Sequence, residues 1–299
     1  MNKLLIISGP TASGKTSLAV ELAKKYHGVL VSADSRQLYK GMDIGTGKDH
    51  PVGIPLHLID ILDPDEDFSV AQYRRLAVSA IDSIQKQGKL PILVGGTGLY
   101  IDSVINPQPT FTLKPVPLLR FFLNRLSVPA LQKIYKLIDH RNFSGLNNSD
   151  LHNPHRLIRR IEIALFSRRR PDAKAQPQYD ALHISLTAPN QFLYDRIDQR
   201  VTARLNVGLL DEIARLLKHY RWSDKGLNTL AYKEFKPYFE HPSAESKIKA
   251  VNEWKFDEHS YMRRQKTWFN KKAGNIFDIS LKDTENKIYQ LVDVWYNKL

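Results

Sequence analysis

The stretch "LLIISGPTASGKTSLAVELAKKY", residues 4–26, decides the fold. Its opening apolar run is typical of a buried strand, and its second half has the apolar spacing of a helix. The loop between them matches the pattern G-x-x-x-x-G-K-[ST], in the required context of strand, loop and helix. The residues that satisfy the pattern are Gly9, Gly14, Lys15 and Thr16. The stretch therefore predicts a loop that binds a di- or triphosphate.

Such a loop binds phosphate for a physical reason. Its backbone N–H groups turn toward one point, and the N-terminus of the following helix adds a partial positive charge. Lys15 adds a full positive charge, and the hydroxyl of Thr16 is a ligand for Mg²⁺, the one cofactor that we predict. The predicted diphosphate-binding residues are Gly9, Pro10, Thr11, Ala12, Ser13, Gly14, Lys15 and Thr16.

Short apolar runs alternate with amphipathic segments through the first hundred residues. "GVLVSAD" (28–34) and "LPILVGG" (90–96) are predicted strands, and residues 70–87 are a predicted helix. Alternation of this kind predicts right-handed βαβ units and a parallel sheet. The predicted fold class is α/β: a P-loop NTPase-like parallel sheet flanked by helices, with a small helical insertion and a helical C-terminal part.

Four prolines in "INPQPTFTLKPVP", residues 105–117, interrupt this pattern. We therefore predict a P-loop α/β core with C-terminal helices from residues 1–106 and 151–299, and a helical insertion domain at residues 107–150. "ALHISLTA" (181–188) is the predicted strand that returns the chain to the sheet.

Composition narrows the class of protein. Hydrophobic residues make up 42% and charged residues 25% of the 299 residues, as in ordinary globular domains, and no apolar run approaches the ~20 residues of a membrane span. Cysteine is absent, so thiol catalysis and Cys-ligated zinc are excluded. We expect a cytoplasmic monomer. The net charge of +13 fits either a polyanionic partner or a solvated basic surface.

A phosphoryl-transfer enzyme of this architecture usually has a metal-binding acid at the end of another strand. The predicted strand at 90–96 ends in "GGTGLY" instead, and only "LVSAD" ends in a carboxylate, that of Asp34. Asp34 is a candidate base or metal ligand, or the N-cap of a helix. Asp60 in "LHLIDI" is a weaker candidate.

With these motifs in order, the sequence resembles the tRNA dimethylallyltransferase (tRNA isopentenyltransferase) family along most of its length. "GPTASGKT", "ADSRQLYKGMDIGTGK", "LHLIDI" and "GGTGLY" fit the amino-terminal half of that family, and "RIDQR", "GLLDEI", "AYKE" and "YMRRQKTWF" fit the carboxy-terminal half. The resemblance implies transfer of a dimethylallyl group from dimethylallyl diphosphate to tRNA, with release of diphosphate. The acceptor would be the exocyclic amine of the adenosine 3′ of the anticodon.

The resemblance also implies residue roles. It makes Asp34 the catalytic base, places Thr97 beside the reacting centre, and brings Arg200 to the diphosphate. It assigns recognition of the target base and its neighbours to Asp34, Ser35, Arg36, Gln37 and Thr97. From the pattern of charges we add basic residues that contact the anticodon stem-loop: Arg156, Arg159, Lys233 and Arg264. Trp268 and Phe269 are interpreted as core residues.

The match has departures. The family's usual "GTAK" is "GTGK" here, its "GYKE" is "AYKE", and Arg204 stands where an apolar residue is usual. We expect these changes to leave the site of prenyl transfer intact and to affect the binding of the tRNA anticodon stem. The alternatives are an adenylate isopentenyltransferase that acts on free AMP, a P-loop nucleotide kinase, and a non-catalytic RNA-binding P-loop protein.

Overall fold

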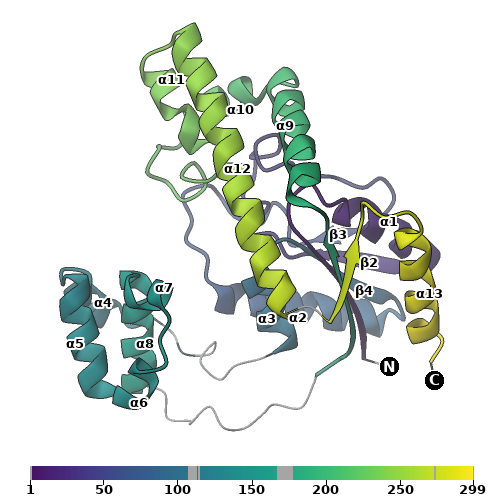
Figure 1. Cartoon of the computed structure of the whole chain (residues 1–299), viewed down its shortest axis with the longest axis horizontal. Helices are drawn as coiled ribbons and strands as arrows, with labels where there is room; N and C mark the ends of the chain where they lie inside the picture. The colour runs from purple at the N-terminus through teal and green to yellow at the C-terminus, as the bar shows by residue number, and fades with distance from the viewer. Residues whose placement is uncertain (1, 107–112, 114, 167–177, 273, 299) are drawn as a thin grey trace. The chain divides into compact units, whose positions relative to one another are not determined.

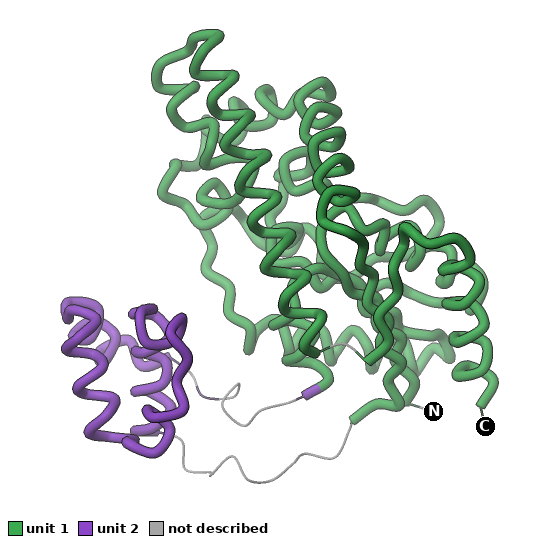
Figure 2. Tube along the Cα trace, in the orientation of Figure 1, with its two compact units in different colours: residues 1–105, 177–299 green, residues 106–176 purple. Residues whose placement is uncertain are grey.

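The computed structural model describes residues 2–106, 113, 115–166, 178–272 and 274–298 (Figure 1). The chain divides into two compact units, residues 1–105 with 177–299, and residues 106–176 (Figure 2). Each unit is described by itself.

The first unit is built on six parallel strands in the order β3-β2-β4-β1-β5-β6. They are β1 (Lys3–Ser8), β2 (Gly28–Ser32), β3 (Leu56–His57), β4 (Leu90–Gly95), β5 (Asp180–Thr187) and β6 (Asn275–Asp278). β1, β2 and β4 are buried along their whole length, which explains their nearly unbroken apolar sequences. The predicted α/β class with a parallel sheet is confirmed.

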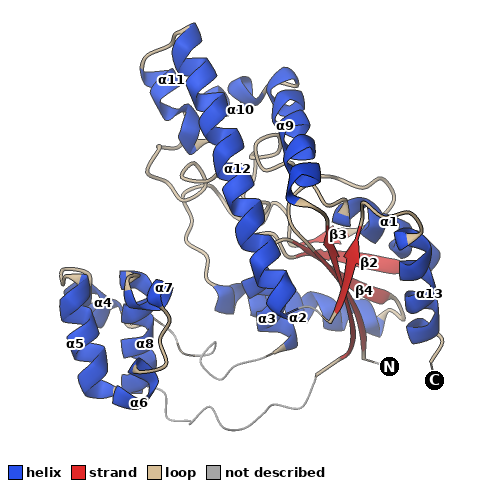
Figure 3. Cartoon of the chain, in the orientation of Figure 1, coloured by secondary structure: helices blue, strands red, loops and turns tan. Residues whose placement is uncertain are grey.

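Helices cover both faces of this sheet (Figure 3). α1 (Lys15–Lys25) and α13 (Thr284–Tyr296) pack on one face. The other core contains α2 (Val70–Lys86), α3 (Gly98–Ile105), α9 (Asn190–Asn206) and α12 (Ala244–Lys272). Three shorter helices complete the unit: α10 (Leu209–Leu216), η2 (Lys233–Phe235) and α11 (Lys236–Glu240). None of the described helices combines the length and the apolar character needed to cross a bilayer.

Lys3 joins the two ends of this unit. It is buried in β1, and its ammonium group donates hydrogen bonds of 2.8 Å to the carbonyl oxygens of Trp295, Tyr296 and Lys298. These carbonyls lie at the end of α13, where a positive charge complements the helix dipole. The first strand and the last helix therefore stabilise each other.

The second unit is helical: α4 (Pro117–Leu123), α5 (Val128–Ile138), α6 (His140–Phe143), α7 (Asn148–Leu151) and α8 (Pro154–Phe166). Leu131 and Tyr135 of α5 pack against Leu157 and Ile161 of α8 in a core of their own. The prediction that the insertion ends at residue 150 is therefore wrong. The apolar face of α8 covers α5 rather than the sheet, so residues 151–176 belong to the insertion.

Candidate functional site

The predicted phosphate loop connects β1 to α1. Gly14 precedes α1 with a φ of 77°, and Ala12 has a φ of 63°, so the backbone turns sharply toward the helix N-terminus. Gly9 is required because a Cβ there would lie 2.8 Å from the carbonyl oxygen of Leu186. Lys15 folds back over the loop, and its Nζ donates to the carbonyl of Pro10 at 3.2 Å. This is the geometry of a nest for an oxyanion.

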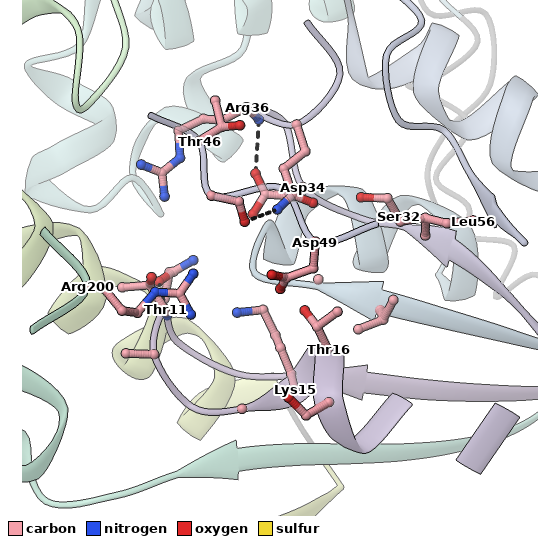
Figure 4. Close-up of a pocket in the computed structure, with 18 of the residues that line it drawn as sticks. Thr11, Lys15, Thr16, Ser32, Asp34, Arg36, Thr46, Asp49, Leu56 and Arg200 are labelled. Carbon is pink, nitrogen blue, oxygen red and sulfur yellow. Dashed lines mark hydrogen bonds between the residues drawn. The ribbon is translucent and has the colours of Figure 1, made fainter. Parts of the chain in front are cut away.

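The loop forms one wall of a cavity of about 70 Å³ at the carboxyl ends of the strands (Figure 4). Its lining residues are Thr11, Ala12, Gly14, Lys15, Thr16, Ser17, Ser32, Asp34, Arg36, Gln37, Thr46, Gly47, Asp49, Leu56, Val94, Gly95, Arg200, Arg204 and Gln265. The predicted phosphate, base and arginine residues thus come together from three parts of the chain. Gly9, Pro10 and Ser13 shape the loop without lining this cavity.

Lys15 is the most perturbed cation of this wall. Burial lowers the pKa of its ammonium group, Asp34 and Asp49 act to raise it, and Arg200 and Arg36 act to lower it, so that the resulting pKa is about 8. Figure 4 shows Lys15 and Arg200 directed toward the same space. A desolvated ammonium group among guanidinium groups favours an anionic ligand between them.

Asp34 follows β2 on the opposite wall. Its Oδ1 accepts a hydrogen bond of 3.0 Å from the backbone N–H of Arg36, which is the pattern of an Asx-turn. Residues 35–41 form bends, turns and a β-bridge at Tyr39, and not a helix, so the alternative that Asp34 caps a helix is wrong. The carboxylate is half-buried at the cavity, where it can accept a proton from a bound substrate.

Thr97 holds the Asp34 turn to the end of β4. Its Oγ1 accepts from the backbone N–H of Ser35 at 3.0 Å and donates to Ser35 Oγ at 3.3 Å. Thr97 and Ser35 do not line the cavity, although each stands next to it in the fold. The structure therefore gives Thr97 a clear role in positioning the turn that carries Asp34.

Arg36 and Gln37 are held within the fold. Nη1 of Arg36 lies 3.2 Å from Oε1 of Glu258 in α12, and its guanidinium stacks over the ring of Tyr261 at 4.5 Å. Nε2 of Gln37 donates to the carbonyl of Gly47 at 3.2 Å. Both side chains line the cavity, so they are placed to contact an acceptor group next to Asp34.

Gln265 is a site residue that sequence reasoning missed. Its Oε1 accepts from the N–H of Thr11, and its Nε2 donates to the carbonyl of Gly96, each at 2.9 Å. This buried amide thereby joins the phosphate loop to the glycine turn after β4. The sequence held a signal, because Gln265 stands between Met262 and Phe269 on the buried stripe of α12.

Three further residues around the cavity were missed. Asp49 and Arg204 line it, and Glu212 lies behind its loop. The carboxylate of Glu212 accepts from the N–H groups of residues 43–45 at 2.8–3.0 Å and from the hydroxyl of Tyr232 at 2.7 Å. Two of the departures from the family pattern, Gly47 and Arg204, line this cavity together with the predicted Lys15, Thr16, Asp34 and Arg200.

Asp60 has a different role from a metal ligand. Among the described residues, Asp43, His50 and Asp60 are the one acidic and histidine group close enough to share an ion. Lys48 already occupies the position of such an ion, with its Nζ 2.8 Å from Asp43 Oδ1 and in contact with Asp60 Oδ1.

The cavity itself offers other oxygen ligands for a metal ion. They are the hydroxyl of Thr16 and the carboxylates of Asp34 and Asp49.

The predicted tRNA-binding cations lie in both units. In α8, Arg156 is 2.8 Å from Asp150, and Arg159 is 3.0 Å from the fully buried Glu162. Burial acts to raise the pKa of Glu162, but hydrogen bonds that include those from Arg120 and Arg159 outweigh it and lower that pKa to about 2. Arg156 and Arg159 are therefore partly engaged in contacts within their own unit. The cations at residues 168–170 and 174 lie outside the described residues.

In the first unit, Lys233 is paired with Asp257 at 2.7 Å, and Arg264 is exposed on α12 near the ring of Tyr261. Phe269 is buried in the core, and Trp268 packs against that core, as predicted. Arg264 is thus available to a ligand, and Lys233 is partly neutralised.

The sequence matches two family models. "IPP transferase" covers residues 37–272, and "Isopentenyl transferase" covers residues 2–55. Proteins named tRNA dimethylallyltransferase are 40% identical in Roseiflexus sp. (strain RS-1), over 99% of both chains, and 35% identical in Leuconostoc citreum (strain KM20), over 99% of both chains.

Solved structures agree with these matches. The full-length tRNA isopentenylpyrophosphate transferase of Bacillus halodurans is 34% identical with a TM-score of 0.73, over 99% of this chain and 97% of that one. A eukaryotic dimethylallyltransferase acting on tRNA, 24% identical with a TM-score of 0.86, has the same fold over 100% of this chain and 81% of its own. With the cavity described above, these matches mean that the chain belongs to the tRNA dimethylallyltransferase family and is a prenyltransferase.

Proposed function

We propose that the chain transfers the dimethylallyl group from dimethylallyl diphosphate to the exocyclic amine of the adenosine 3′ of the anticodon in tRNA, and releases diphosphate. One observation carries this proposal. A desolvated ammonium group and an arginine line the phosphate side of a cavity whose other wall presents the carboxylate of Asp34. The groups that would bind the diphosphate of the donor and the carboxylate that would take the proton of the acceptor therefore line the same cavity.

The phosphate loop would hold the leaving group. The bond between the allylic carbon and the diphosphate oxygen breaks as negative charge develops on the diphosphate. The N–H groups at the N-terminus of α1, the ammonium of Lys15 and the planar guanidinium of Arg200 would stabilise that charge. Because these groups are fixed before the reaction, they need little reorganisation in the transition state.

The cavity also fits the predicted Mg²⁺. The hydroxyl of Thr16 and the carboxylates of Asp34 and Asp49 are hard oxygen donors, which this ion prefers. When bound, Mg²⁺ would neutralise negative charge on the diphosphate. We expect Thr16 to bind the Mg²⁺, because phosphate loops with the same sequence pattern place this hydroxyl next to the bound anion.

On the acceptor side, Asp34 would take the proton that the amine loses as the carbon–nitrogen bond forms. The amine lone pair is delocalised into the adenine ring, so a positioned base contributes ~10²–10⁴-fold to the rate. To reach Asp34 the adenosine must leave its stack, as in other enzymes that act on a base. Arg36 and Gln37 would contact the flipped base, and Ser35 and Thr97 would support the turn that presents Asp34 to it.

We further propose that the anticodon stem-loop is bound through Arg156, Arg159, Lys233 and Arg264, and that the enzyme works as a monomer in the cytoplasm. The excess of 13 positive charges supports a polyanionic substrate. The absence of cysteine is consistent with a reducing compartment.

The test is transfer of a radiolabelled dimethylallyl group, with Mg²⁺, to bulk unmodified tRNA and in parallel to AMP. Label in tRNA alone is expected. Label in AMP would instead assign the chain to the enzymes that act on free nucleotides. If neither acceptor is labelled, the proposal is wrong, and protection of the fold by ATP against heating would then favour a nucleotide kinase.

A further inference from the structure

Arg204 is a fourth cation of the cavity. It lies one turn after Arg200 on α9, and residues four apart share a face of a helix. Both arginines line the main cavity, and both border a smaller hollow, too narrow for a ligand, next to Thr11 and Glu258. Burial and the charge of Arg200 lower the pKa of Arg204 to about 10, which indicates that the two guanidinium groups lie close enough to repel each other.

The protein balances little of this charge. Within the described part of the chain, Arg204 donates one hydrogen bond, from Nη1 to the carbonyl of Gly45 at 3.2 Å. Its nearest carboxylate is Glu258 at 4.0 Å, which Arg36 holds more closely at 3.2 Å. A guanidinium group has five N–H donors, so most of the donors of Arg204 remain for a ligand.

Gly47 makes room for this guanidinium. A Cβ at residue 47 would lie 1.8 Å from Nη2 and 2.5 Å from Cζ of Arg204. The two positions depart from the family pattern together, with glycine in place of the alanine of "GTAK" and arginine in place of an apolar residue. The two departures are therefore in contact: if residue 47 carried a side chain, the guanidinium of Arg204 would have to move from this position.

The charges of the cavity indicate which ligand Arg204 meets. Four cations, Lys15, Arg36, Arg200 and Arg204, face the carboxylates of Asp34 and Asp49. Arg204 shares its hollow with Thr11 of the phosphate loop and with Arg200. A small, multiply charged anion held by that loop would lie between the two arginines and remove their repulsion.

We propose that Arg204, in the space left by Gly47, is a second arginine that binds the diphosphate of the donor and of the product. This inference rests on the proposed function, because it concerns the leaving group of the same reaction. It adds a specificity for the diphosphate that an apolar residue at this position would not supply.

The test is calorimetric binding of inorganic pyrophosphate, with Mg²⁺, to the full chain and four variants. Arg204→Met is expected to bind about 10- to 100-fold more weakly, as for the loss of hydrogen bonds to a charged group. Arg204→Lys keeps the charge but loses the planar fork and should fall in between. Arg215→Met removes an exposed arginine of α10 and should bind like the wild type. Arg200→Met serves as the positive control.

Salt and a double-mutant cycle separate binding from a purely structural role. Pyrophosphate binding by Arg204→Met should depend less on ionic strength, because one cationic contact is lost. Gly47→Ala should weaken binding more in the wild type than in the Arg204→Met background, because the clash with the guanidinium disappears there while the strain of a side chain at a φ of 63° is common to both. A purely structural role would change the thermal stability and leave the salt dependence unaltered.

The outcomes are distinct. If Arg204→Met binds pyrophosphate like the wild type while Arg200→Met does not, this inference is wrong and the proposed function stands. If Arg204→Met raises the KM for tRNA alone, the arginine serves the acceptor and the inference is again wrong. If the wild type itself binds no pyrophosphate and transfers no label, the proposed function fails as well.

Discussion

At the residue scale, Asp34 is the side chain on which the proposed reaction depends most. Asp34→Asn keeps the shape and the turn around Arg36 N–H but cannot accept a proton. We expect single-turnover transfer of label to fall ~10²–10⁴-fold while affinity for tRNA, measured by filter binding, changes only a few-fold. A collapse of tRNA affinity with an unchanged transfer rate at saturation would make Asp34 a recognition residue instead.

Lys15 should make pyrophosphate binding depend on pH. The pKa of its ammonium group is about 8 in the free protein because of burial and the neighbouring arginines. The protonated form attracts the anion, so affinity should be complete below pH 7 and fall as pH rises through 8, by up to about tenfold per unit. Lys15→Arg stays charged over this range and reports the titration of the ligand alone. Equal slopes for the two proteins would contradict the prediction.

Ala231 adopts a left-handed backbone, with a φ of 77°, where the family pattern has glycine. Ala231→Gly relieves about 1–2 kcal/mol of strain but loses a buried methyl group and gains chain entropy when unfolded. We therefore expect the free energy of unfolding to change by no more than about 0.5 kcal/mol. Ala203→Gly, in the exposed face of α9, should cost about 1 kcal/mol. Urea denaturation of both variants checks the contrast, and equal losses would contradict it.

At the scale of elements, α12 connects two loops through one amide. Gln265→Met keeps the volume but leaves the N–H of Thr11 and the carbonyl of Gly96 without their partner. We expect a loss of about 1–3 kcal/mol in unfolding free energy and a raised KM for the donor, since the phosphate loop loses a support. Gln290→Met, on the exposed face of α13, is the control for both measurements. An unchanged donor KM would show that the loop is rigid without α12.

The elements that sequence predicted best have a strong local signal. β1, the phosphate loop and α1 follow from one motif, and α2 was expected at 70–87 and runs from Val70 to Lys86. α8 was assigned to the wrong domain, because residues from 151 onward were predicted to belong to the core. Its apolar stripe shows that one face is buried, yet nothing in that stripe says whether a sheet or another helix covers it.

The site was predictable to the extent that its residues carry motifs. Lys15, Asp34 and Arg200 were identified because a motif or a resemblance names them, and the structure places all three on one cavity. Gln265 and Arg204 were missed because their roles depend on contacts with residues more than 150 positions away. Contacts over such separations depend on the path of the chain, which residue spacing alone does not encode.

At the scale of the whole molecule, the second unit should contribute to tRNA binding alone. Arg156 of α8 has half of its side chain exposed and shares Asp150 with Arg160, so its loss should leave that unit folded. Arg156→Ala is expected to weaken tRNA binding and to reduce its salt slope by about one, with pyrophosphate affinity unchanged. Filter binding at several salt concentrations tests this. An unaltered slope would show that Arg156 meets no phosphate.

The order of strands has a consequence for synthesis on the ribosome. β1 is synthesised first, yet one of its neighbours in the sheet is β5. The carbonyl of Lys298, to which Lys3 of β1 donates a hydrogen bond, is synthesised almost last. Until then the nascent sheet has an open edge that can pair with other chains. Arg200, Arg204 and Gln265 also arrive in the last third of translation. A growing chain therefore carries a phosphate loop long before it carries the walls that close around the anion.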